Sequence, residues 1–210
     1  MNKTVELVRL WGVYEQQHPE ASLEDFFYHQ SFRSPVIKAN FPADSRMIPD
    51  LNGRLTILIR RIGKYHIMFS NKAMEGTGLV QIEEFGILVS IFNQGNPIKS
   101  EVIFQNMMEL SSGTNMLSRL KKRGLISEYA DKEDKRVKRL KLTPKGETAL
   151  NKGKVKVLKT AALMMHMLSD EDKQHCIQLL TPVHAKFEGS FQKQRNQEFD
   201  EIYKEFMDVE

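Results

Sequence analysis

Apolar side chains recur every three or four residues along most of this chain, a pattern that predicts amphipathic helices. The longest stripe runs from Leu51 to Phe69, with Asp50 as the expected N-cap of its helix. A second stripe runs from Ile177 to Phe191 and contains Pro182, which is expected to kink or divide that helix. The other predicted helices cover residues 4–17, about 22–32, 82–92, 99–107, about 111–123 and 144–167. Ser22, with a capping-box pattern, and Thr143 are the expected caps of two of these helices, and Ser169 caps the helix with the second stripe.

The pattern changes after Gly124, which is expected to end a helix. Leu125 to Tyr129 and Val137 to Leu142 alternate apolar and polar residues around a charged turn, so they predict a β-hairpin. Three short helices followed by such a hairpin form a winged helix-turn-helix. The predicted fold is therefore mainly α, a winged helix-turn-helix (three short helices plus a two-stranded β-wing) with long flanking dimerisation helices.

These elements divide the chain into three regions. Residues 1–49 form a helical N-terminal extension, residues 50–76 and 144–210 a helical dimerisation region, and residues 77–143 the winged helix-turn-helix DNA-binding domain. The extension is too aromatic for a solvated tail, so we expect it to pack on the dimerisation helices. Its aromatic residues include Trp11, Phe26, Phe27, Phe32 and Phe41.

Composition narrows the class of protein. With 210 residues, 40% of them hydrophobic, the chain can bury a sizeable core. Its single cysteine, Cys176, excludes an intramolecular disulfide, and no apolar run resembles a signal peptide or a membrane span. We therefore expect a cytoplasmic protein with no membrane partner.

Charge is concentrated near the predicted hairpin. Between Leu117 and Gly146 there are eleven basic and four acidic residues, a local charge of +7 against −3 for the rest of the chain. A basic segment on a slightly acidic body is typical of a protein that docks one face on a polyanion. A solvated, mixed-charge face explains this pattern equally well by itself.

The helix predicted over about 111–123 has two different faces. Gly113 and the apolar residues share one face, and Gly113 would let the preceding helix approach closely. The other face starts with short polar side chains and ends with cations, which suits insertion of its N-terminal end into a major groove. An ordinary solvated helix face is the alternative. The side chains predicted to contact DNA here are those of Ser111, Ser112, Thr114, Asn115, Ser118 and Lys122.

The tip of the predicted hairpin gives a second, independent indication. Residues 131–136 are all charged, so this turn cannot pack against a core. Asp134 is expected to hold the guanidinium of Arg136, which would enter a narrow minor groove where the potential is most negative. A plain surface hairpin remains the alternative.

Five fragments in register resemble the MarR (multiple antibiotic resistance regulator) family. The hairpin tip resembles the family's D-x-x-D-x-R wing motif, and residues 142–146 resemble its L-T-x-x-G signature. The other matching fragments are Ser100-Glu101-Val102, residues 117–126, and Phe85 with Gly95 at matching distances upstream.

The resemblance implies an obligate dimer built by helices from both ends of the chain. It also implies DNA contacts from the recognition helix and wing, carried here by Ser111, Ser112, Thr114, Asn115 and Arg136. Three features depart from the family. Many members have Arg in place of Asn115, Ile98 stands where a capping Thr or Ser is common, and residues 1–49 extend beyond the usual start.

Other chemistry finds little support in the sequence. There is no catalytic constellation or nucleotide loop, so we expect no enzyme activity, no catalytic residues, no cofactor and no metal site. Cys176 beside His175 could act as a redox sensor, but burial on an amphipathic helix is the favoured interpretation, and core filling is favoured for the methionines at 164–167.

The sequence as a whole predicts a sequence-specific double-stranded DNA-binding transcriptional regulator, expected to be a repressor, that acts as a homodimer on a pseudo-palindromic operator. A small-molecule or oxidant effector is left open. A winged-helix protein-interaction module without DNA binding is the alternative, and it would lack the wing motif and the basic excess.

Overall fold

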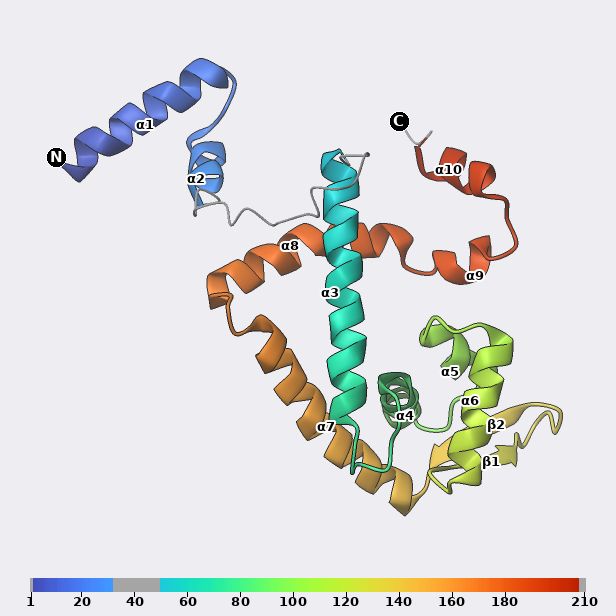
Figure 1. Cartoon of the computed structure of the whole chain (residues 1–210). Helices are drawn as coiled ribbons and strands as arrows, with labels where there is room; N and C mark the ends of the chain where they lie inside the picture. Colours follow the sequence, from blue (N-terminus) through green and yellow to red (C-terminus); the bar gives the residue numbers. More distant parts are fainter. Residues whose placement is uncertain (1, 32–49, 208–210) are drawn as a thin grey trace, which may run out of the picture. The chain divides into compact units, whose positions relative to one another are not determined.

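The computed structural model of the chain describes residues 2–31 and 50–207, which form ten helices and one two-stranded sheet (Figure 1). The chain divides into two compact units, residues 1–50 and residues 51–210, and each is described by itself. No helix among the residues described here has the length and apolar content needed to cross a membrane.

The N-terminal unit contains α1 (Lys3–Gln17) and α2 (Leu23–Ser31). Ser22 begins α2 with the predicted capping box: its hydroxyl accepts the Asp25 N–H at 3.1 Å, and Asp25 Oδ2 accepts the Ser22 N–H at 2.7 Å. Phe26 is buried, with its ring edge-on to Trp11 at 5.3 Å between centroids. Aromatic packing therefore joins the two helices, while Phe32 and Phe41 lie outside the described residues.

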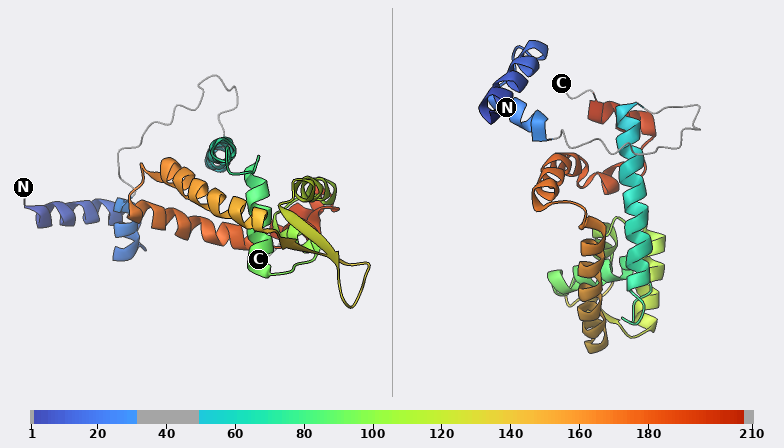
Figure 2. Two further views of the ribbon diagram at one scale, coloured as in Figure 1. Left: turned by 90° about the horizontal axis from the view of Figure 1, so that it is seen from below. Right: turned by 60° about the vertical axis from the view of Figure 1, so that its left-hand side comes forward.

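The second unit is built around a winged helix-turn-helix, as the sequence predicts. Its helices α4 (Ile82–Gln94), α5 (Lys99–Gln105) and α6 (Leu110–Lys122) precede the antiparallel strands β1 (Ile126–Ala130) and β2 (Lys138–Leu142). The turn between the strands projects away from the helices (Figure 2). All five elements contribute to a single core, whose members include Ile87, Leu88, Val102, Ile103, Leu117, Leu120, Ile126 and Leu140.

Two longer helices flank this module, α3 (Leu51–Ala73) and α7 (Pro144–Met165), and they pack against each other and against α4. Thr143 caps α7 as predicted, because its hydroxyl accepts the Gly146 N–H at 3.1 Å and proline occupies the first helical position. The stripe from Leu51 to Phe69 lies on α3, where Ser70 alone is buried. The apolar residues of this stripe therefore remain exposed in the single chain.

The C-terminal helices are α8 (Asp170–Phe187), α9 (Ser190–Gln194) and α10 (Phe199–Met207). Of the two effects expected of Pro182, a kink or a division, division does not occur, because proline removes only one N–H and α8 continues on both sides of it. The favoured burial of Cys176 and of the methionines is also not found. Cys176 is exposed, since α8 buries no residue in this chain, and Met167, between α7 and α8, is 80% exposed.

Most element boundaries differ from the predicted ones by one to two residues, whereas α8 ends at Phe187, before the end of the predicted stripe at Phe191. Local hydrogen bonds explain the boundaries next to the wing. Gly124, at φ 73°, ends α6, and the Leu125 N–H then donates to the Leu120 carbonyl at 3.0 Å. That bond delays β1 until Ile126. Val137 joins the turn through its N–H, which donates to the Asp134 carbonyl at 2.9 Å, so β2 begins at Lys138.

Candidate nucleic-acid interface

The two faces of α6 are arranged as the periodicity predicts. Its buried face consists of Gly113, Met116, Leu117 and Leu120. A Cβ at Gly113 would lie 2.5 Å from the Ile103 side chain, so only glycine permits this approach of α5 to α6. The predicted DNA-contacting side chains lie away from this core: Ser111, Ser112, Asn115, Ser118 and Lys122 are exposed and Thr114 is half-buried.

The exposed face of α6 offers different groups along its length. The first turn carries the hydroxyls of Ser111 and Ser112, and the exposed amide of Asn115 follows one turn later. The Ser118 hydroxyl donates to the Thr114 carbonyl at 2.9 Å, so it is engaged within the helix. Cations are confined to the last turn, where they complement the negative end of the helix dipole.

The wing turn is organised by Asp131. Its Oδ1 accepts the N–H groups of Glu133 and Asp134 at 2.9 and 3.2 Å, and its Oδ2 binds Arg139 Nε. The hydrogen bond from Arg139, aided by these two backbone donors, lowers the pKa of Asp131 to about 2. The turn therefore keeps a charged carboxylate at its base over the ordinary pH range.

Arg136 is presented at the tip of this turn. Asp134 Oδ1 accepts its N–H at 2.9 Å and its Nε at 3.3 Å, which is the contact that the wing motif predicts. The Arg136 side chain is nevertheless 94% exposed. Asp134 thus holds the Arg136 backbone and the Nε edge of its guanidinium, while the rest of the guanidinium faces solvent.

The wing is also tied to the helix-turn-helix. Arg139 donates to the Asn96 carbonyl at 2.8 Å and forms a β-bridge with Ile98, and the Leu140 N–H donates to the Pro97 carbonyl at 2.9 Å. A groove of about 340 Å³ lies between α5, the start of α6 and the wing. Thr114 and Arg136 both line this groove, whereas the other side chains that were predicted to contact DNA lie outside it.

Ion pairs change how the basic segment is interpreted. Of its eleven cations, four form ion pairs in the described chain: Lys121 with Glu128, Arg123 with Glu84, Arg136 with Asp134 and Arg139 with Asp131. Arg123 and Arg139 hold the fold together, so they contribute less to an interface than a count of charges suggests. The remaining cations of the segment form no ion pair within residues 2–31 and 50–207.

Glu84 is the residue that sequence analysis missed. Its side chain is 3% exposed, accepts the Val80 N–H at 2.8 Å and lies 2.7 Å from the Arg123 guanidinium. A signal was present, because Glu84 has the helical spacing of Ile87, Leu88 and Ile91 and must share their buried face. An acid at a core position requires a partner, and Arg123 at the end of α6 provides it.

Among the described residues, no group of three or more histidine, cysteine and acidic side chains has the arrangement of a metal site. The candidate interface consists of hydroxyls, an amide and cations on α6 and the wing, groups that bind phosphates and base edges.

Comparison with known proteins agrees with this geometry. The model of the MarR family matches residues 74–138. A solved structure of mutant MarR from E. coli complexed with operator DNA superposes with a TM-score of 0.59 at 22% identity, covering 64% of this chain and 99% of that one.

Two further structures share the fold. The PcaV transcriptional regulator from Streptomyces coelicolor, in complex with its natural ligand, has a TM-score of 0.59 at 19% identity and covers 66% of this chain and 97% of that one. BpsR from Bordetella bronchiseptica, whose DNA binding is regulated by 6-hydroxynicotinic acid, has a TM-score of 0.57 at 19% identity, with coverages of 62% and 98%.

Proposed function

Because the model of the MarR family matches residues 74–138 and the fold agrees with it, we propose that the protein is a MarR-type, sequence-specific regulator of transcription that binds double-stranded DNA. The observation that carries the proposal is the presentation of Arg136, anchored by Asp134 yet 94% exposed, beside the polar face of α6. A helix in the major groove and an arginine in the adjacent minor groove would use both features. The E. coli MarR structure with operator DNA shows that this fold can dock on a duplex.

We further propose that the protein acts as a homodimer. Leu51, Leu55, Leu58, Ile62, Tyr65 and Phe69 on α3 are each at least 39% exposed, as are Ile177, Leu180, Val183 and Phe187 on α8. Apolar faces of this extent are rare on soluble monomers and mark contact surfaces. A two-fold dimer would place two copies of α6 on a pseudo-palindrome, with half-sites about one helical turn apart.

Repression and a response to an effector complete the proposed function. A dimer bound across an operator blocks other proteins from the same duplex, which favours a repressor. PcaV is described with a natural ligand and BpsR with 6-hydroxynicotinic acid, so small molecules act on proteins of this fold. The runner-up, a protein-interaction module without DNA binding, gives no role to the ordered wing motif.

Fluorescence anisotropy with a duplex selected from random sequence tests the DNA-binding proposal. Arg136→Ala is expected to weaken binding to specific and scrambled duplexes alike, because a guanidinium in the minor groove acts mainly through charge. Arg9→Ala, which removes an exposed arginine of α1, is the matched control. Equal affinities for the two variants would refute the role of the wing.

Asn115→Ala tests sequence readout separately. If the amide bonds a base edge, its loss relaxes preference at one base pair by about 1–3 kcal/mol and leaves binding to scrambled DNA unchanged. Asn93→Ala, at the exposed end of α4, controls for loss of a surface amide. Unaltered preference at every position would show that Asn115 reads no base.

Sedimentation equilibrium without DNA tests the dimer. A dimer at micromolar concentration is expected, since the faces of α3 and α8 require a partner surface. A stable monomer at that concentration would contradict the proposal.

A further inference from the structure

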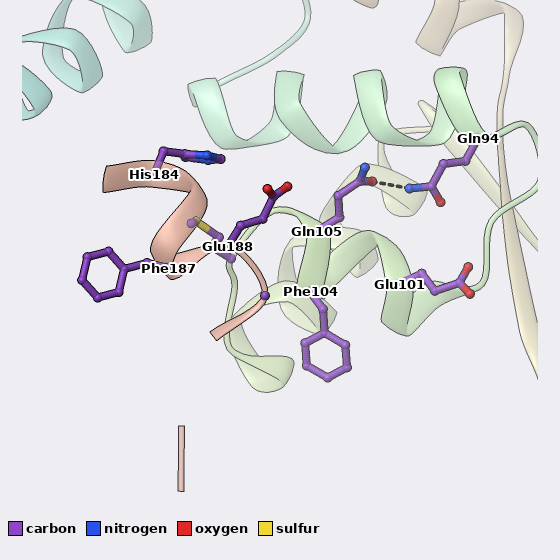
Figure 3. Close-up of a pocket in the computed structure, with 9 residues that line it drawn as sticks. Gln94, Glu101, Phe104, Gln105, His184, Phe187 and Glu188 are labelled. Carbon is purple, nitrogen blue, oxygen red and sulfur yellow. Dashed lines mark hydrogen bonds between the residues drawn. The ribbon is translucent and has the colours of Figure 1, made fainter. Parts of the chain in front are cut away.

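An open cavity of about 740 Å³ lies where the end of α8 faces α5 and the end of α4. Figure 3 shows its lining, which comes from parts of the sequence about eighty residues apart: Gln94, Glu101 and Gln105 on one side, His184 and Glu188 on the other. The volume lies within the range of ligand sites for small molecules, roughly 300–1,000 Å³. The cavity is separate from the groove beside the wing.

The polar groups in this cavity favour a cation. The Glu188 carboxylate and the His184 imidazole point toward Gln105, whose amide oxygen accepts a hydrogen bond from Gln94 on the same wall (Figure 3). Glu188 forms no ion pair or hydrogen bond through its side chain with any residue that the structure describes. Besides the imidazole of His184, the charged groups of the lining are two carboxylates, with neither lysine nor arginine, so the cavity favours a cation over an anion.

The apolar part of the lining favours an organic ligand over a metal ion. Phe104, Met107 and Phe187 border the cavity (Figure 3). The Phe187 ring points away from Glu188 and packs on Phe206 at 4.9 Å between centroids, so Phe104 and the exposed Met107 are the apolar groups left for a ligand. No set of three His, Cys, Asp or Glu side chains in the described chain is arranged to hold a metal. A ligand with a hydrophobic body would contact the apolar residues at the rim, and a positively charged group on it would contact the Glu188 carboxylate.

We propose that this cavity binds an organic cation, an amine or ammonium compound with an apolar body, with Glu188 as the counter-ion and Gln105 as a hydrogen-bonding partner. Charge-assisted hydrogen bonds to a carboxylate are among the stronger polar interactions of proteins, and the amide pair of Gln94 and Gln105 fixes the opposite wall.

The cavity borders α5, which packs directly on α6, the proposed recognition helix. Its wall is α5, which carries Ile103 against Gly113 of α6, so a shift of α5 is transmitted to α6 by direct packing. Beyond α9, Arg195 lies 3.7 Å from Glu109, the residue at the N-cap of α6. The cation would thereby alter operator affinity. This coupling rests on the proposed DNA-binding function, whereas the binding itself does not.

Isothermal titration calorimetry on the full chain tests the site with three probes that share one body. Phenylbutylamine carries a positive charge at neutral pH, phenylbutanol none and phenylbutyrate a negative one. We expect the amine to bind at least tenfold more tightly than either analogue, and Glu188→Gln to weaken it about tenfold. Glu171→Gln, at the exposed start of α8, is the matched control and should leave binding unchanged.

Two outcomes would overturn the proposal: equal binding of the three probes, or an amine affinity that Glu188→Gln does not change. Absence of amine binding at millimolar concentration would overturn it as well. Operator affinity measured without probe separates this test from the proposed function. If wild type fails to bind DNA, the regulator proposal fails while the calorimetry still decides the cation site.

Discussion

Replacing Arg123 with methionine removes the ion pair that fixes the end of the recognition helix to α4. Glu84 is 3% exposed and Arg123 31% exposed, with 2.7 Å between Glu84 Oε2 and the guanidinium. Removing one partner of a buried ion pair costs about 3–5 kcal/mol, because the remaining charge stays desolvated. Since water reaches nearly a third of Arg123, we expect Arg123→Met to lower the free energy of unfolding by about 2–3 kcal/mol.

A variant of Glu84, the partner of Arg123, separates the effect of losing the charge from the effect of losing side-chain packing. Glu84→Gln keeps an oxygen for the Val80 N–H, which is 2.8 Å from the carboxylate, but removes the charge. We expect it to cost about 1–2 kcal/mol, and the double variant to cost about 1–2 kcal/mol less than the sum of the single ones.

Urea unfolding followed by circular dichroism, at one fixed protein concentration, measures these free energies. Arg136→Met is the matched control, because its 94% exposed side chain is expected to contribute no more than about 0.5 kcal/mol. If Arg123→Met cost as little as this control, or if the two single variants were additive, the pair would not anchor α6.

Three other changes have defined outcomes. Gly146→Ala would place a Cβ 2.0 Å from the Leu125 carbonyl oxygen, so it should lower the melting temperature, whereas Gly63→Ala on α3, with nothing within 4 Å, should not. Asp131 has a pKa of about 2 in the folded state, below its unfolded value of about 4. Its contribution to stability is therefore complete above pH about 4 and is lost as the pH falls toward 2, and Asp131→Asn should flatten acid unfolding in that window, as urea titrations at each pH would show. Deleting residues 1–45 should lower the melting temperature and weaken self-association in sedimentation; unchanged values would mean that the extension serves another role.

The fold was predictable because its signals are local. The capping residues Ser22, Thr143 and Ser169 and the helix-ending Gly124 each act within four residues of their own position, and all have the predicted role. The alternation in β2 and the spacing of apolar residues in α6 likewise determine which faces are buried.

Contacts between distant residues were not predictable in this way. The pairing of Glu84 with Arg123 depends on where α4 and α6 meet, and the anchoring of Arg139 to the Asn96 carbonyl depends on how the wing joins α5. The wing motif predicts that Asp134 binds Arg136, but it does not reveal that Asp131 binds Arg139. Periodicity also cannot show whether an apolar stripe is covered by its own chain, which is why Cys176 was expected to be buried.

Hydroxyl-radical footprinting on a selected duplex tests most directly whether α6 and the wing bind DNA as a two-fold pair. We predict two protected regions related by the pseudo-palindrome, with half-site centres about one helical turn apart and flanking minor-groove protection at each end. Arg136→Ala should remove the flanking protection while the central protection persists at saturating protein. A single asymmetric footprint, or flanking protection that survives in Arg136→Ala, would contradict the account.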